Sequence, residues 1–401
     1  MNKIELLAPA GNLEKAKIAL LYGADAVYVG GKKFSLRARA SNFEVSDIQE
    51  LCRFAKELNK KVYITMNIIP HNEDFTGLEE YLLELQKAGV DAIITSSLYI
   101  IKTAQRLIPS VECHVSTQMS ITNSSAVKYW EAQDVKRVVL AREVTLDELS
   151  QIMPKIKVPV EIFIHGGMCA SYSGRCVLSN YFTSRDANRG GCAHSCRWNY
   201  TLFNHEHRIG HTKQFYNMGS KDLMAISYIP RLIDLGVASL KIEGRMKSTY
   251  YLATVIRCYR KAIDWYYEKG KITKEELEWL EKEINKAENR MTNDGFYRGI
   301  VDVDGTLYDD RAEHPTKEYI GYVLDYDSLK QMALIEQRNY FEVGDQVEFF
   351  GPNLDNQTFV IEQIIDAATG LELTVARHPL QQLLIKVPFE LKKDDMMRKV
   401  K

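Results

Sequence analysis

Four of the seven cysteines in this 401-residue chain lie close together in the stretch CASYSGRCVLSNYFTSRDANRGGCAHSC. They are Cys169, Cys176, Cys192 and Cys196. The stretch is rich in Gly, Ser, Asn and Arg, a composition unlike that of a hydrophobic core, so the clustering favours a metal-binding site over four packed thiols. The other three cysteines each lie on an apolar face of an expected helix or strand, where core packing is the default: Cys52, Cys113 and Cys258.

The cysteine spacing bears on which metal centre would form. Structural zinc sites favour CxxC pairs, in which one tight turn supplies two ligands, but the spacings here are Cx6C, Cx15C and Cx3C. An iron–sulfur cluster accepts thiolates from loops of looser spacing, and amides of the nearby GGM and RGG stretches could donate to its sulfides. The spacing favours a cluster and leaves zinc as the alternative. A nucleophilic pair of Cys169 and His165 is a third possibility, although it would use a cysteine that the cluster needs.

Composition limits the classes of function. The chain is 45% hydrophobic and 26% charged with a net charge of −1, which excludes a globally polybasic nucleic-acid binder but allows a local basic surface. No apolar region resembles a secretion signal, and no apolar run approaches the roughly 20 residues that cross a bilayer. We therefore expect a cytoplasmic protein with no membrane partner, in which thiols stay reduced and a disulfide framework is a poor explanation of the cluster.

The elements that must position these thiols follow a regular rhythm from residue 4 to about 245. Short β-rich runs alternate with amphipathic helical stretches, several of which end in Gly just before the next strand. The expected strands cover residues 4–8, 26–30, 62–68, 91–96, 111–117, 137–141, 160–165 and 238–244. Eight alternations without a GxGxxG fingerprint predict an α/β fold with a TIM-like (β/α)8 barrel over residues 1–248. A Cys-rich insertion, residues 166–220, follows strand seven.

The remainder of the chain has a different pattern. Residues 249–316 are expected to form a helical segment and a linker, with Thr273 and Glu276 in a capping-box pattern at the start of the second helix. Residues 317–401 contain six short strands separated by turns, which predicts a small antiparallel β-barrel domain. We expect the final stretch, KKDDMMRKVK (392–401), to be a solvated end.

Active sites of such barrels lie at the C-terminal ends of the strands. Several arginines expected there suit an anionic ligand, because guanidinium groups match carboxylates and phosphates. Glutamate and histidine at the same end could orient those arginines or move protons, although salt bridges that order a crowded rim would explain single residues equally well. The candidates for cofactor binding are Arg37, Arg39 and Arg142. The candidates for catalysis are Glu243, His165 and Arg245.

The insertion also carries local charge and aromatic residues. Between His165 and Phe215, six Arg and Lys stand against two acidic residues, a local charge of +4. Interleaved with them are Tyr172, Tyr181, Phe182, Trp198 and Tyr200. Basic groups with aromatic side chains suit the exposed nucleotides of a folded RNA, and equally the aromatic residues could pack the insertion against the barrel. The HEHRIGH stretch (205–211) lacks the HExxH register and is weak evidence for metal.

Several ordered motifs resemble the collagenase-like peptidase family of unknown catalytic type. They are LLAPAG, GADAVYVG, HGGMCASYSGRC, NRGGCAHSCRW, KDLMAI, SLKIEGRMKS and NRMTNDGFYRG. Better-understood members resemble hydroxylation factors that hold a [4Fe-4S] cluster on four cysteines. The resemblance thus implies that Cys169, Cys176, Cys192 and Cys196 are the cluster ligands.

The closest subgroup in this resemblance is that of the tRNA hydroxylation proteins, which make 5-hydroxyuridine at the wobble position with prephenate as a required metabolite. The resemblance therefore implies a tRNA uridine 5-hydroxylase that acts on the anticodon loop, with a possible paralogous protein partner. Two alternatives stay open: a collagenase-like peptidase, and a non-catalytic RNA-binding accessory protein with a structural cluster.

Overall fold

A computed structural model describes residues 3–36, 42–287, 290–307 and 318–400. By its internal contacts the chain divides into two compact units. The first comprises Met1–Glu283 and Arg290–His314, and the second comprises Ile284–Asn289 and Pro315–Lys401. The predicted anion-binding residues Arg37 and Arg39 lie outside the described residues. No described helix is both long enough and apolar enough to cross a lipid bilayer.

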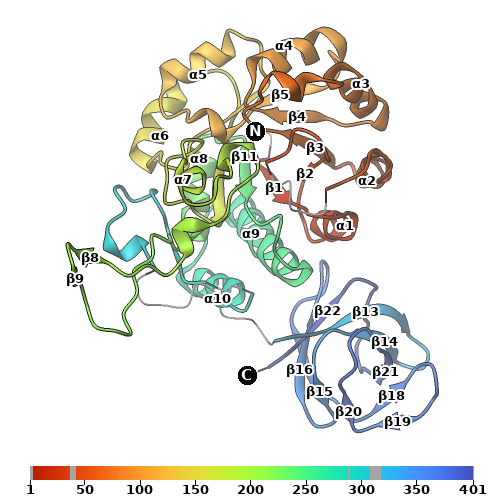
Figure 1. The fold of residues 1–401 in the computed structure, drawn as a ribbon. Helices are drawn as coiled ribbons and strands as arrows, with labels where there is room; N and C mark the ends of the chain where they lie inside the picture. The colour runs from red at the N-terminus through yellow and green to blue at the C-terminus, as the bar shows by residue number, and fades with distance from the viewer. Residues whose placement is uncertain (1–2, 37–41, 288–289, 308–317, 401) are drawn as a thin grey trace. The chain divides into compact units, whose positions relative to one another are not determined.

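The first unit contains a closed barrel of eight parallel strands (Figure 1). The strands are β1 (Glu5–Pro9), β2 (Ala26–Gly30), β3 (Lys61–Met66), β4 (Ala92–Thr95), β5 (Glu112–Val115), β6 (Arg137–Val139), β7 (Val160–Gly166) and β11 (Ser239–Ile242). The barrel closes because β11 pairs in parallel with β1 on one side and with β7 on the other. The predicted TIM-like barrel is therefore confirmed, and each predicted strand overlaps an observed one.

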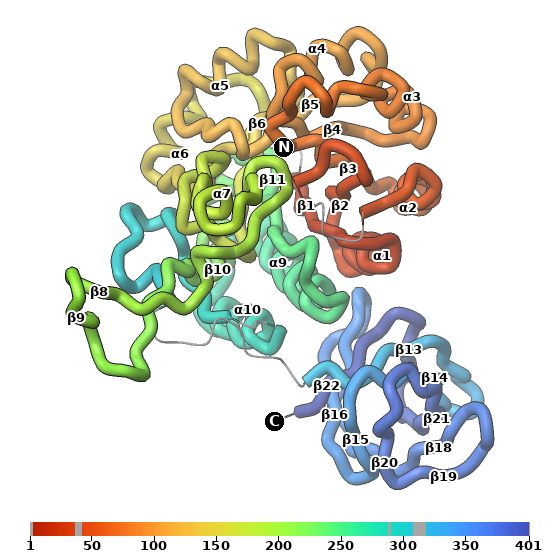
Figure 2. The backbone as a smooth tube through the Cα atoms, in the orientation of Figure 1, coloured from red at the N-terminus to blue at the C-terminus, as the bar shows by residue number. Residues whose placement is uncertain are grey.

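Helices cover the outside of the barrel (Figure 2). They are α1 (Leu13–Leu21), α2 (Val45–Glu57), α3 (Leu78–Ala88), α4 (Leu98–Leu107), α5 (Ser124–Glu131), α6 (Leu146–Ile152), α8 (Ile229–Asp234) and α9 (Thr249–Lys269). Side chains at their N-termini accept hydrogen bonds from otherwise unpaired amides, as Asn12 does for α1 and Ser248 for α9. Short 3-10 turns are η1 (Asn72–Phe75), η2 (Thr117–Met119), η3 (Met153–Lys155), η6 (Ile226–Tyr228) and η7 (Val303–Gly305). Helix α10 (Lys274–Asn285) begins at the predicted capping box, in which Thr273 and Glu276 bond each other's backbone amides.

The insertion between β7 and β11 is mostly irregular. It contains α7 (Leu178–Thr183), η4 (Ala187–Arg189), η5 (Ser195–Arg197), the hairpin β8 (Phe203–Asn204) and β9 (His207–Arg208), and β10 (Asp222–Met224). Strand β10 returns antiparallel to the end of β7, and β12 (Thr292–Asn293) pairs with β10. The insertion is thus hydrogen-bonded to the rim of the barrel where β7 ends.

The second unit is an antiparallel sheet that curls around its own apolar core as a half-barrel. Its strands are β13 (Tyr319–Asp327), β14 (Met332–Gln337), β15 (Phe341–Glu342), β16 (Gln346–Phe350), β17 (Gln357–Val360), β18 (Ile364–Asp366), β19 (Glu372–Leu373), β20 (Val375–Ala376), β21 (Gln382–Lys386) and β22 (Met396–Lys399). The expected solvated end was wrong, because β22 lies between β13 and β16 with Met396, Met397 and Arg398 buried. The charged residues of this stretch gave no indication of a buried strand. Arg398 can be buried in it because its charge is neutralised inside the unit by Glu348.

Candidate active site at the mouth of the barrel

A cavity of about 480 Å³ lies where the C-terminal ends of the barrel strands meet the insertion. The barrel contributes Tyr28, Thr65, Asn67, Arg142, Phe163, Lys241, Glu243 and Arg245 to its wall. The insertion contributes Tyr172, Tyr181 and all four clustered cysteines. The structure therefore brings most of the predicted site residues together in one cavity: the four cysteines, Arg142, Glu243 and Arg245.

Glycines at the end of β7 let the first thiol reach this cavity. Gly166 has a φ of 97°, and a Cβ built there would come within 2.2 Å of the backbone oxygen of Glu243. No other residue type fits that close approach with a positive φ. The chain can therefore turn sharply after β7 and place Cys169, three residues further on, in the cavity wall.

The other three thiols are held by hydrogen bonds of the insertion itself. The backbone oxygen of Cys176 accepts from Asn188 Nδ2 at 2.8 Å, and that of Cys196 accepts from the amide of Met218 at 2.8 Å. Cys192 follows Gly191, whose amide donates to the backbone oxygen of Asp186. These bonds fix the loops that carry the thiols although the loops have little regular structure.

The four thiols influence one another electrostatically. Burial raises the pKa of Cys196, the other three thiols raise it further, and the neighbouring Arg197 opposes them. All seven cysteines are free thiols. Within the described ranges no group of three or more His, Cys, Asp or Glu side chains is placed to hold one metal ion. The four thiols thus share one cavity without forming a single-ion site.

The other three cysteines confirm their predicted place in the core. All are buried, and burial raises the pKa of Cys52 and of Cys113 to about 12. Because a thiolate rather than a thiol binds metal, these two are poor ligands.

Arg142 and Lys241 both line the cavity, but only Lys241 has a carboxylate partner among the described residues. The guanidinium carbon of Arg142 lies 4.0 Å from the ring centroid of Phe163, and no described residue forms an ion pair with it. Lys241 Nζ lies 4.4 Å from the ring centroid of Tyr28 and binds Glu161 Oε1 at 2.7 Å. Arg142 therefore remains available to an anionic ligand, whereas Lys241 already has a carboxylate partner.

Arg245 lines the cavity, but the structure commits its guanidinium to local hydrogen bonds. Its Nη1 donates to Ser35 Oγ at 2.9 Å and its Nη2 donates to Asn42 Oδ1 at 3.1 Å. A Cβ built on Gly30 would lie 2.3 Å from Nη2, so the group packs directly on the end of β2. Glu243, two residues before it, is half-buried in the same wall. Both stay predictions as catalytic residues.

His165, the third residue predicted to be catalytic, does not line the cavity. The pairing register of β7 and β11 shifts between Phe163 and His165, and such a bulge reverses the alternation of side chains. Phe163 consequently faces the cavity, while the buried ring of His165 packs against Tyr251 and Tyr259 of α9. Its Nδ1 lies 3.2 Å from the Tyr259 hydroxyl. The Cys169–His165 pair is therefore not assembled in this cavity.

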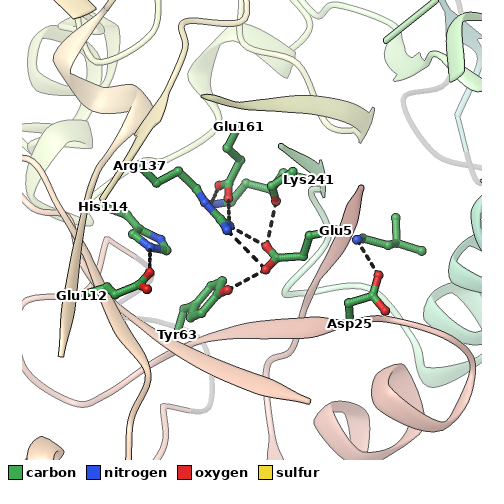
Figure 3. A network of polar contacts seen from close by, with 10 residues as sticks. Glu5, Asp25, Tyr63, Glu112, His114, Arg137, Glu161 and Lys241 are labelled. Carbon is green, nitrogen blue, oxygen red and sulfur yellow. Dashed lines mark hydrogen bonds and ion pairs between the residues drawn. The ribbon is translucent and has the colours of Figure 1, made fainter. Parts of the chain in front are cut away.

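Beneath the cavity, a network of charged side chains occupies the barrel interior (Figure 3). Glu161 binds Lys241 and also Arg137, whose Nη1 lies 3.1 Å from it, and Arg137 binds Glu5 in turn. The hydroxyl of Tyr63 donates to Glu5 at 2.6 Å. Burial by itself would raise the pKa of Glu161, but Lys241 and Arg137 outweigh it and lower that pKa to about 2. Glu161 is therefore ionised at neutral pH and holds two cations beneath the cavity.

This interior network was not among the predicted features, although the sequence carries a signal of it. Three of its charged residues stand between apolar residues in a barrel strand, namely Glu5 in IEL, Glu161 in VEI and Lys241 in LKI, and Arg137 begins β6 directly before two valines. Alternation places such a residue inside the barrel, where it requires an opposite charge.

Part of the predicted positive charge of the insertion is neutralised by other segments. Arg189 donates to Asp74 Oδ2 at 2.6 Å, and Arg197 lies 3.9 Å from Asp222. Arg175 Nε donates to Ser120 Oγ at 3.0 Å. The arginines therefore fasten the insertion to the barrel as well as contributing charge.

Comparison with known proteins extends over both units. Residues 11–306 match "Peptidase family U32" and residues 315–398 match "Peptidase family U32 C-terminal domain". The chain is 47% identical to "tRNA hydroxylation protein P1" of Bacillus subtilis, over 100% of this chain and 95% of that protein. It is 32% identical to "tRNA hydroxylation protein P" of Escherichia coli, over 98% and 95%. It is also 30% identical to a "Collagenase" of Porphyromonas gingivalis, over 99% and 98%.

Proposed function

The chain belongs to peptidase family U32, and from that premise we propose that it is a tRNA-modifying enzyme that hydroxylates the wobble uridine. The observation that carries the proposal is the single cavity lined by four free thiols and by Arg142. The full-length relatives named as tRNA hydroxylation proteins support tRNA as the substrate.

An iron–sulfur cluster is the cofactor that this thiol set fits best. In a [4Fe-4S] cluster each thiolate binds a different iron, so the four ligands surround a group larger than one ion. Cys169, Cys176, Cys192 and Cys196 around one cavity provide such a set. Bound there, the cluster would supply electron transfer. The arginine next to Cys196, Arg197, favours the thiolate form of that ligand because it lowers the pKa that burial raises.

Prephenate, a dicarboxylate, is the proposed co-substrate, and the cavity has features that suit it. Arg142 offers a guanidinium without an ion-pair partner among the described residues, stacked on Phe163. The rings of Phe163 and Tyr28 provide apolar wall beside Lys241. Arg142 would bind and orient a carboxylate, while Lys241, held by Glu161, adds positive charge at the floor.

The cavity volume also suits entry of a single base. A modification at uracil C5 requires the base to leave its stack, and an anticodon loop already presents unpaired bases. The chain's own groups would exclude water and hold the base near the thiols.

Peptidase activity is the second candidate, favoured by the name of the Porphyromonas gingivalis relative. It requires a nucleophile beside a base, yet no histidine belongs to the described cavity wall. The ring of His165 points away from the cavity toward Tyr259 of α9. A third candidate is an accessory RNA-binding protein with a structural cluster, which would act only beside a partner enzyme.

Two measurements test the proposal. Anaerobically purified protein should contain iron and sulfide, and Cys→Ser changes at the four positions should remove both, whereas Cys258→Ser should not. Nucleoside analysis of tRNA from a deletion strain should show loss of 5-hydroxyuridine, restored by the wild-type gene. Zinc in place of iron would reject the proposed reaction. So would an unchanged level of 5-hydroxyuridine both in the deletion strain and in a strain that also lacks any paralogue.

A further inference from the structure

Two tyrosines stand at the edge of the cavity and are largely exposed. Tyr172 is 54% exposed and Tyr181 is 83% exposed, yet both belong to the cavity wall. Exposed aromatic residues that border a polar site are typical of surfaces that bind a partner. We call Tyr172 and Tyr181 the tyrosine lip.

The surroundings of these rings differ from those of the other aromatic residues in the insertion. The ring of Phe182 lies 6.4 Å from that of Trp198 and 5.5 Å from that of Tyr200, so these three pack together. Neither ring of the tyrosine lip contacts another aromatic ring of the described chain. Phe182 and Trp198 are also exposed, at 51% and 42%, but their rings have aromatic partners and lie outside the cavity wall. The rings of the lip line the cavity and have no aromatic partner among the described residues.

The backbone beneath each ring of the lip is nevertheless held in place. Tyr181 lies in α7, where its amide donates to the backbone oxygen of Val177. The backbone oxygen of Tyr172 accepts from the amide of Arg175 at 3.0 Å, and the next residue, Ser173, donates to Glu143 at 3.0 Å. A fixed backbone carrying a free ring is what a stacking platform requires, since little entropy is lost when a planar ligand binds.

We propose that the tyrosine lip is a stacking platform for a pyrimidine base that has left the RNA stack, and that it delivers this base to the cavity. The inference rests on the proposed function and adds how the base is recognised. Aromatic side chains bind bases through their faces, independently of sequence. Among the rings that line the cavity, only those of the lip are exposed, since Tyr28 and Phe163 are buried in its wall. An incoming base would therefore meet the lip before the other rings of the cavity.

Binding assays with two RNAs test this assignment. The first RNA is an anticodon stem-loop with uridine at the wobble position, and the second is the same stem-loop with an abasic nucleotide there. Fluorescence anisotropy gives the dissociation constants for the full-length protein and for Tyr172→Ala, Tyr181→Ala and the matching Phe variants. Tyr129→Ala is the control, since Tyr129 is 52% exposed on α5 but lies outside the cavity wall.

Stacking predicts that each Ala variant weakens binding of the uridine RNA by about 5- to 150-fold, the range for one base–aromatic stack. Binding of the abasic RNA should not change, the Phe variants should bind as wild type, and Tyr129→Ala should have no effect. Thermal melting and iron content verify that each variant is folded.

Each contrary result has a separate meaning. If the Ala variants bind the uridine RNA as tightly as wild type, the stacking role of the tyrosine lip is refuted while the proposed function stays intact. Equal losses for both RNAs, or Phe variants as weak as Ala variants, would also overturn stacking, because the base or the ring would then not be the contact. A wild-type protein that binds neither RNA would reject tRNA as the substrate and the lip with it.

Discussion

The buried carboxylate of Glu161 is expected to stabilise the barrel substantially, and Glu161→Gln tests this. The glutamine keeps the size of the side chain but removes the charge that faces Lys241 and Arg137. Arg137 keeps its ion pair with Glu5 in this variant. Lys241 loses Glu161, the only carboxylate among the described residues with which it forms an ion pair. The variant therefore leaves a buried ammonium group without a counter-charge.

The magnitude follows from the pKa of Glu161. This pKa is lowered from 4.5 to about 2 in a carboxyl that is fully buried. At 1.36 kcal/mol per pH unit the difference corresponds to about 3 kcal/mol, near the lower end of the cost of breaking a buried ion pair. Because the folded-state pKa is lowered, the stabilisation is complete above about pH 4.5 and is lost as the pH falls toward 2.

Tryptophan fluorescence can measure this effect in the barrel unit alone, because Trp130, Trp198, Trp265 and Trp279 all lie in that unit. We expect the melting temperature at neutral pH to fall by about 6–12 °C. Glu79→Gln is the matched control, because Glu79 pairs with Arg106 on the surface with both side chains more than half exposed. Its loss should cost less than about 1 kcal/mol.

A second variant separates charge from packing. Adding Lys241→Met to Glu161→Gln removes the uncompensated ammonium group and should restore part of the lost stability. The reasoning would be refuted if Glu161→Gln melted within a degree or two of wild type. It would also be refuted if the double variant were less stable than either single variant.

Three further predictions concern other parts of the chain. Arg142→Gln should reduce 5-hydroxyuridine in tRNA from a complemented deletion strain, and unchanged modification would remove Arg142 from the site. The variant should lose only about 1 kcal/mol of stability, because its guanidinium contacts the ring of Phe163 but forms no ion pair with a described residue. His165→Phe should lower stability by about 1–2 kcal/mol in denaturant titrations, through loss of the contact with Tyr259, yet leave RNA affinity unaltered; weakened binding would instead return His165 to the site. Removal of residues 396–401 should speed amide hydrogen exchange in β13 and β16, because β22 lies between these strands and pairs with both. Melting of the barrel unit, detected by tryptophan fluorescence, should stay the same. Unchanged exchange would show that β22 does not hold this sheet together.

Periodicity predicted the barrel well because each strand and helix repeats a simple rule. Eight alternations and a late, long insertion were enough to place all four thiols at the C-terminal end of the barrel. The same rule failed at His165, where a one-residue shift of register between β7 and β11 turns the side chain to the outside. Nothing in the local sequence VEIFIHG marks that shift, because it depends on how two strands pair.

Charge was the other source of error. Isolated charged residues such as Arg398, and the lysines and aspartates around it, resemble a solvated end when read locally. Arg398 is instead buried because Glu348, far away in the sequence, neutralises it. For the interior network of Glu5, Arg137 and Glu161, the sequence likewise shows charged residues within apolar strands, but only the structure shows which of them pair.

The closure of the barrel has a consequence for how such a protein could diversify. Strands β7 and β11 pair directly through Glu161–Ser239, Ile162–Leu240 and Phe163–Lys241, so residues 167–238 leave and re-enter the barrel between two adjacent strands. Lengthening a loop whose ends are already joined costs little additional entropy. Adjacent parallel strands need a crossover rather than a tight turn, and α8 lies in the crossover between β7 and β11. A barrel with that crossover alone could therefore have acquired its thiols in one insertion event, and descendants could exchange or lose them while keeping an inherited scaffold.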